Sequence, residues 1–178
     1  MKIVALFTGL LLLFAEVKAQ ETYNLDSSNI TYSGYHVAHD WTGVSEAAKG
    51  LLIESDGQLQ RIAVTVPLAS FDSNSSNRDS NALRVLNAIL HPEVRFYSEE
   101  ISQSDDKTVE LFGFFELNGI RKNYRVKLRL ESQEGQVNLA GDFRVNLNDF
   151  DLKLPRFLLK PIEDEIDLSV DLKFKQNR

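Results

Sequence analysis

The sequence contains no cysteine. The chain therefore forms no disulfide bond, offers no thiolate as nucleophile or metal ligand, and cannot be anchored through a lipid on an N-terminal cysteine. It also lacks the Gly-x-Ser-x-Gly motif of α/β-hydrolases and the glycine-rich loop that holds phosphate groups. These absences argue against the commonest nucleophilic and nucleotide-dependent enzymes, and we expect a protein that is not an enzyme.

Basic residues form no block, and the formal net charge is −6 at pH 7. An acidic chain without a basic cluster is a poor partner for nucleic acid or for an anionic membrane surface. The excess of acidic residues is explained by the need to keep the protein soluble.

The first residues have the pattern of a signal peptide. Lys2 supplies a positive start, the apolar stretch from Ile3 to Phe14 is too short to span a bilayer comfortably, and Val17 to Ala19 places small residues at the cleavage positions. A retained anchor is the alternative, and Glu16 argues against it by ending the apolar run early. We expect residues 1–19 to be removed, residues 20–178 to form a single domain without a permanent membrane anchor, and the protein to be periplasmic or secreted.

Apolar and polar residues alternate through the second half of the chain, which indicates strands with one apolar and one polar face. The clearest run is the last, where polar residues separate Ile166, Leu168, Val170, Leu172 and Phe174. The same period occurs over residues 124–131 and 137–145. Further strands are expected over about 23–37, 48–53, 58–66, 94–98 and 108–117.

Turns are predicted where glycine follows a small polar or acidic residue, at Asp56-Gly57, Asn118-Gly119 and Glu134-Gly135, and a further turn is predicted at Trp41-Thr42-Gly43. One helix is expected. Asp79 or Ser80 is suited to cap it, and His91-Pro92 to end it. Its apolar residues keep helical spacing at Leu83, Leu86, Ala88, Ile89 and Leu90. We expect this helix to cover one end or a seam of the sheet.

The segment from Asn148 to Lys160 breaks the alternation. Pro155 and Pro161 bar a central strand, yet the segment is rich in leucine and phenylalanine, so it must pack against an apolar surface.

About eight antiparallel strands with short turns are best closed into a barrel, because closure removes exposed edges. The predicted fold class is all-β with one short helix, arranged as an antiparallel β-barrel of about eight strands. A two-sheet sandwich is the alternative.

Short motifs along the mature chain carry a resemblance to a known family. They are residues 23–26 followed by Ser28, Ile30 and Tyr32; His39 leading toward Gly50; and residues 67–72, 77–79, 91–96, 113–119 and 143–146. Taken in order, they resemble the YceI-like family. The resemblance implies an exported, lipocalin-like barrel that holds a long isoprenoid or related lipid: a polyprenyl quinone, a polyprenyl phosphate or a fatty-acid derivative. It implies no cofactor other than the bound lipid.

A flexible hydrocarbon is held by burial, so the candidate lipid-binding residues are inward-facing apolar ones. The candidate wall residues are Phe96, Phe115, Val126, Leu128, Phe143, Val145, Leu168 and Val170, and the candidate entrance residues are Trp41, Leu154 and Phe157. Ordinary core packing is the alternative for each. His39, Arg78 and Asp79 are candidates for a polar head-group contact or for a structural role, the latter pair as an ion pair or helix cap.

The chain departs from the family pattern at Asn81, where a histidine is usual, and at Ile120 to Lys122, where Thr-Lys is usual. A head-group contact made by the family histidine is therefore altered here.

Other chemistry is weakly indicated. His36 and His39 would point to opposite faces of a strand and have no third ligand at a familiar spacing, so no metal site is expected. Acidic pairs such as Glu99-Glu100 are read as solvated charge. Phe112 and Phe114 lie out of phase with the apolar face of their strand, which makes a homodimer surface possible.

Three hypotheses stay open: a lipid carrier, a packed barrel that serves interactions without a ligand, and an enzyme acting on a lipid.

Overall fold

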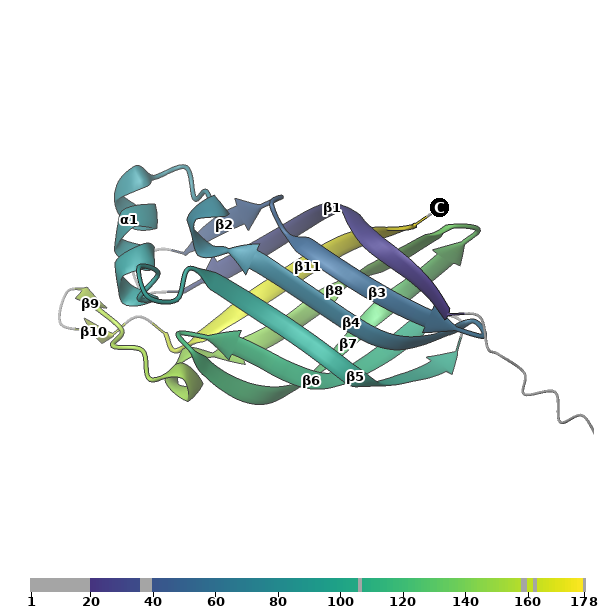
Figure 1. The fold of residues 1–178 in the computed structure, drawn as a ribbon. Helices are drawn as coiled ribbons and strands as arrows, with labels where there is room; N and C mark the ends of the chain where they lie inside the picture. The colour runs from purple at the N-terminus through teal and green to yellow at the C-terminus, as the bar shows by residue number, and fades with distance from the viewer. Residues whose placement is uncertain (1–19, 36–39, 106, 158–159, 162, 178) are drawn as a thin grey trace, which may run out of the picture.

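The alternating segments form strands that close into a barrel (Figure 1). The computed structural model describes residues 20–35, 40–105, 107–157, 160–161 and 163–177. The strands of the barrel are β1 (Gln20–Gly34), β2 (Trp41–Ser45), β3 (Lys49–Ser55), β4 (Gln58–Pro67), β5 (Glu93–Asp105), β6 (Thr108–Leu117), β7 (Ile120–Gln133), β8 (Gln136–Asn146) and β11 (Glu165–Gln176). Their order is β11-β8-β7-β6-β5-β4-β3-β1-β2, and a pairing of β11 with β1 closes the ring. The predicted antiparallel barrel is confirmed, and the sandwich alternative is wrong.

Strands β2 and β3 both pair with the same side of β1, one with each end of it. The first part of β1, from Gln20 to Asn24, pairs with β3, whereas its last part, from Ile30 to Gly34, pairs with β2. The turn predicted at Trp41 to Gly43 is therefore wrong. These residues form a strand because glycines leave room for two rings: a Cβ on Gly34 would lie 2.6 Å from the Trp41 ring, and one on Gly43 2.3 Å from the Tyr32 ring.

On its other side, β2 has no strand partner among the described residues. It is tied to the segment after β4 by a single bridge, in which the backbone N–H groups of Val44 and Asp72 each donate to the carbonyl of the other at 2.9 Å. The hydroxyls of Ser45 and Ser70 add a hydrogen bond of 2.6 Å. This junction, here called the β2 seam, lies beside the short 3₁₀ helix η1 (Leu68–Ser70).

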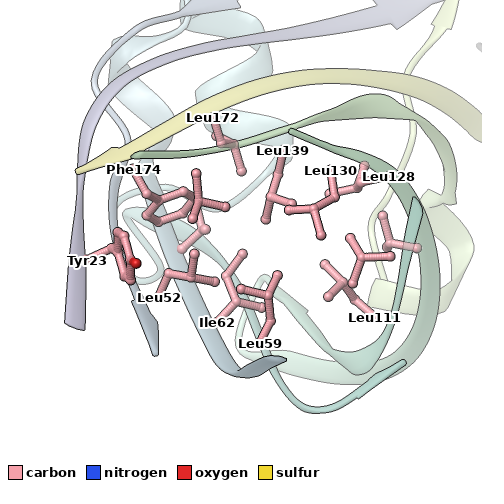
Figure 2. Packing of buried hydrophobic residues seen from close by; sticks show 14 of the residues in the cluster. Tyr23, Leu52, Leu59, Ile62, Leu111, Leu128, Leu130, Leu139, Leu172 and Phe174 are labelled. Carbon is pink, nitrogen blue, oxygen red and sulfur yellow. The ribbon is translucent and has the colours of Figure 1, made fainter. Parts of the chain in front are cut away.

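The end of the barrel farther from the helix is packed solid. Leu52, Val109 and Leu139 are fully buried there, and Phe174 is 1% exposed. Figure 2 shows the labelled side chains pointing into the interior from strands around the barrel. Alternation explains this core, because every second residue of each strand faces inward.

The helix α1 (Ser76–Val85) lies across the opposite end (Figure 1). It begins and ends earlier than predicted. Its N-cap is Ser75, and Asp79 lies in its first turn. It ends because Asn87 adopts a left-handed φ of 54°, with the Ala88 N–H donating to the Leu83 carbonyl at 2.9 Å. This is a Schellman-type ending, so Ala88, Ile89 and Leu90 lie outside the helix.

Strand β5 is longer than the predicted 94–98 segment. A register shift between Ser98 and Glu100 marks a β-bulge against β6. A bulge inserts an extra residue and reverses the phase of alternation, which hides the strand's continuation from a period-two reading. The predicted turn at Asn118-Gly119 is confirmed, with φ values of 51° and 72°.

The apolar segment after β8 packs against the core, as predicted. It comprises the 3₁₀ helix η2 (Leu147–Phe150) and the short strands β9 (Arg156–Phe157) and β10 (Lys160–Pro161). Phe150 is fully buried, and Leu147 and Leu152 are each 8% exposed. They belong to a second apolar cluster at the α1 end, with Phe115 and Val145.

The predicted signal peptide, residues 1–19, lies outside the described residues and stays a prediction. Within the described part of the chain, no helix is both long enough and apolar enough to cross a bilayer.

A carboxylate pair at the packed end gives a prediction about pH. Glu54 on β3 lies directly opposite Glu21 on β1. Burial, and secondarily the charge of Glu21, raise the pKa of Glu54 above its usual 4.5. The folded state thus holds this proton more tightly than the unfolded state, and stability is lost as pH rises from about 4.5 through the folded pKa. We expect Glu54→Gln to raise the urea midpoint at neutral pH and to leave it unchanged below pH 4.5. Equal midpoints for both proteins at neutral pH would contradict this.

Candidate functional site

An apolar cavity of about 280 Å³, lined in part by residues of α1, opens at the α1 end of the barrel. Its wall comes from residues of β1, β4 to β8 and β11, and its mouth is bordered by α1, by Trp41 at the start of β2 and by residues after η2. The barrel interior is thus divided between a packed half and a hollow half. The volume is close to the lower end of small-molecule pockets, roughly 300–1,000 Å³.

Most of the predicted wall residues line this cavity. They are Phe96, Phe115, Val126, Leu128, Phe143, Leu168 and Val170. Val145 does not line it; its side chain is fully buried and packs within the second apolar cluster.

Two of the predicted entrance residues, Trp41 and Leu154, border the cavity. Phe157 lies in β9, whose side chains fall outside the described part, and His39 lies outside the described residues altogether. Arg78 and Asp79 both border the cavity.

Sequence reasoning missed the contribution of the helix. Ala82, Leu83 and Val85 of α1 and its C-cap residue Leu86 line the cavity, together with Tyr32 and Phe71. The helical spacing of Leu83 and Leu86 was the available signal, since it gave the helix an apolar face that needed a partner. None of the helix residues is buried, so this face borders the cavity without being packed away.

The polar residues at the mouth form a defined cluster. The Asp79 carboxylate accepts hydrogen bonds from the backbone N–H of Ser73 at 3.2 Å and from its hydroxyl at 2.5 Å. Arg78 donates from Nη1 to the Ser73 carbonyl at 3.1 Å. Both side chains therefore hold the loop before α1, which is the structural role, while also bordering the cavity.

Tyr32 belongs to the same region. Its ring meets the Phe71 ring edge-on at 5.6 Å. Burial raises the pKa of Tyr32, the Asp79 charge raises it further, and Arg78 opposes them. The hydroxyl stays protonated at neutral pH, and a hydrogen bond with the Ser73 side chain lowers its pKa slightly against these causes.

An aromatic group supports one side of the cavity. The Phe115 ring lies 5.6 Å from that of Tyr124, 5.7 Å from that of Phe150 and 6.4 Å from that of Phe143. Tyr124 donates to Asp149 at 2.9 Å, and burial is the main cause that raises the pKa of Tyr124 to about 12. Fixed rings make this wall rigid.

The remaining sequence candidates do not gather into a reactive centre. In the parts of the chain that the structure describes, no three His, Asp or Glu residues lie close enough to hold a metal ion. Glu99 forms an ion pair with Arg61 on the outer surface. Phe114 remains 49% exposed on the barrel wall, and the Arg125 guanidinium lies 5.3 Å above the Phe112 ring.

Comparison with known proteins agrees with this architecture. Residues 22–174 match the family described as the YceI-like domain. A UPF0312 protein of Pseudomonas savastanoi is 26% identical over 164 residues, covering 84% of this chain and 79% of the relative. A UPF0312 protein of Photorhabdus laumondii is 25% identical over 185 residues, covering 96% and 94%.

Among solved structures, Burkholderia cenocepacia BcnA superposes with a TM-score of 0.73 at 13% identity, covering 82% of this chain and 95% of its own. A polyisoprenoid binding domain from Saccharophagus degradans gives a TM-score of 0.68 at 10% identity, covering 87% and 98%. At such identities the likeness is one of fold. The family match spans nearly all of the described barrel, and this chain belongs to the YceI-like domain family.

Proposed function

We propose that the protein is a non-catalytic carrier that holds one long-chain lipid, an isoprenoid or an acyl derivative, in the hollow half of its barrel. The observation that carries this is the apolar cavity at the α1 end, whose lining is almost wholly hydrocarbon and aromatic. Membership of the YceI-like domain family supports it, as does the fold shared with a domain described as polyisoprenoid binding.

Burial supplies the binding energy in this proposal. Each square ångström of apolar surface removed from water contributes roughly 25 cal/mol, so a chain of several isoprene units needs no ion pair to be retained. Wall residues such as Phe115 and Leu128 are already shielded from bulk solvent, and the Phe115 ring is held by the Phe143 and Phe150 rings. Because the far half of the interior is packed, the chain would enter only from the α1 end.

The charges at the mouth favour a neutral head group. Of the two described arginines that border the cavity, Arg95 is paired with Glu93 at 2.8 Å and with Glu116 at 3.4 Å. Arg78 donates to the Ser73 carbonyl and directly precedes Asp79 in the first turn of α1. A phosphate brought to this cluster would face the Asp79 carboxylate. A quinone, ester or amide would instead accept from the Tyr32 hydroxyl.

This gives a prediction about ligand choice. We expect a polyprenyl quinone to bind at least roughly tenfold more tightly than the polyprenyl phosphate of equal chain length, because a buried charge without a free partner is strongly disfavoured. Asp79→Asn should narrow the difference by removing the opposing charge. Competition between the two lipids, read by native mass spectrometry, measures it. Tighter binding of the phosphate by the unaltered protein would show that the head-group assignment is wrong.

Export completes the proposal. The N-terminal pattern supports delivery of the carrier to the periplasm or the exterior, where a hydrocarbon ligand that leaves a membrane needs shelter from water.

The direct test is to produce the protein in a bacterial periplasm, purify it without detergent and record its native mass before and after organic extraction. We expect a stoichiometric lipid adduct that extraction removes. An unliganded mass that persists after incubation with polyprenyl quinone and with fatty-acid derivatives would instead support a barrel that serves interactions alone.

A further inference from the structure

Two large apolar side chains project into solvent at the mouth of the barrel. Ile89 is 97% exposed and Leu90 is 71% exposed, the largest exposed fractions of any large hydrophobic residue in the described part of the chain. They are adjacent in the turn that joins α1 to β5, at the end of the molecule where α1 lies (Figure 1). Isolated exposed leucines are ordinary, but an adjacent pair at a binding-site entrance is not.

Hydrogen bonds fix the conformation of this turn. The N–H groups of Leu90 and His91 both donate to the Asn87 carbonyl at 3.0 Å. The Asn87 amide donates to the Asn118 side-chain oxygen at 3.2 Å, which ties the turn to the β6–β7 hairpin. The exposure of the two side chains is thus a property of an ordered turn.

The turn stands next to the cavity entrance. Leu83 and Leu86, which come shortly before Ile89 in the chain, line the cavity. A lipid that passed between a bilayer and the cavity would therefore cross the mouth beside Ile89 and Leu90.

We propose that this turn docks the mouth of the barrel onto a lipid bilayer by inserting Ile89 and Leu90 into the membrane interface. The proposal rests on the proposed function, since docking serves a cavity that exchanges lipid. The two side chains stand almost free in solvent, so a protein partner would need a pocket matching both of them, whereas a bilayer accepts exposed apolar side chains of any shape. The net charge of −6 gives the chain no electrostatic attraction to anionic lipid. Burial of the two side chains must therefore supply the affinity, and a bilayer of zwitterionic lipid suffices.

Two inserted side chains give a weak, reversible association. Each changes the partition coefficient by roughly tenfold or more when it leaves water. This affinity is well short of that of a permanent anchor, which buries far more hydrocarbon in the membrane. A carrier that must leave the membrane after loading needs this reversibility.

The test is flotation of the full-length mature protein with phosphatidylcholine vesicles, comparing it with the double variant Ile89→Ser, Leu90→Ser. We expect the variant to lose at least roughly tenfold in partition coefficient, and the addition of phosphatidylglycerol not to strengthen binding. Phe114→Ser, which alters an exposed ring on the barrel wall, is the matched control and should bind as the unaltered protein does. Thermal midpoints check that all three proteins are equally folded.

Equal vesicle binding by the double variant overturns the docking proposal, as does absence of binding by the unaltered protein. So does a dimer in gel filtration that the double variant lacks, since a second copy would then cover the turn. Loading of the cavity from lipid dissolved in ethanol needs no docking, so it tests the proposed function separately from the docking proposal. If the cavity is loaded neither from vesicles nor from lipid in ethanol, the proposed function fails and docking is judged by flotation alone.

Discussion

Val170→Trp is expected to abolish lipid loading while leaving the barrel folded. Val170 faces the cavity from β11, where its cross-strand partners are Ile30 on β1 and Gly141 on β8. An indole placed there would occupy the volume that a ligand needs. Since it fills a void, we expect the free energy of unfolding to change by less than about 1 kcal/mol, where the same substitution in a packed core would cost about 1–3 kcal/mol.

The matched control is Ser169→Trp. Ser169 precedes Val170 on the same strand, but its side chain is exposed on the outer face. We expect this variant to retain its lipid adduct. Native mass spectrometry and urea unfolding measure both variants. Full loading of Val170→Trp would show that the ligand does not occupy the cavity, whatever its affinity for the protein.

Phe150→Ala is expected to give the largest loss of stability. The Phe150 ring is fully buried, stacks on Tyr124 at a centroid distance of 6.2 Å and contacts Phe115. Its removal leaves a void in the second apolar cluster, and truncations of this kind cost about 3–5 kcal/mol. That is a large share of a total stability of roughly 5–15 kcal/mol.

Phe114→Ala removes the same number of atoms from a ring that is 49% exposed on the barrel wall. We expect a change within about 1 kcal/mol for this control. Urea unfolding, followed by circular dichroism, gives both values. If Phe150→Ala costs no more than Phe114→Ala, the segment after β8 does not contribute to the core.

The barrel was predictable because a strand with one apolar face has a period that no helix shares. Each alternating run from residue 108 onward became a strand, and the glycine turns fell where expected. The failures have local causes. The turn assigned to Trp41 and Gly43 was a strand whose glycine makes room for the Tyr32 ring, a contact between residues distant in sequence. The helix end depended on the left-handed conformation of Asn87.

The cavity was less predictable than the wall around it. Leu52 and Val170 both belong to apolar strand faces, yet Leu52 is fully buried in the packed half, whereas Val170 borders the hollow half. Val145 and Val170 likewise looked equivalent. Periodicity states which residues face inward, but the space left between them depends on the summed volumes of side chains from eight positions around the ring. That sum is set by tertiary packing.

The β2 seam gives the barrel unequal resistance to widening. Between other neighbours in the ring, separation would break a ladder of main-chain hydrogen bonds along much of a strand. At the seam, the contacts include only two main-chain hydrogen bonds, between Val44 and Asp72, together with the Ser45–Ser70 hydroxyl contact and the edge-on contact of the Tyr32 and Phe71 rings. We therefore expect the ring to open first at this seam when a bulky ligand enters, while the other strand pairs keep their register.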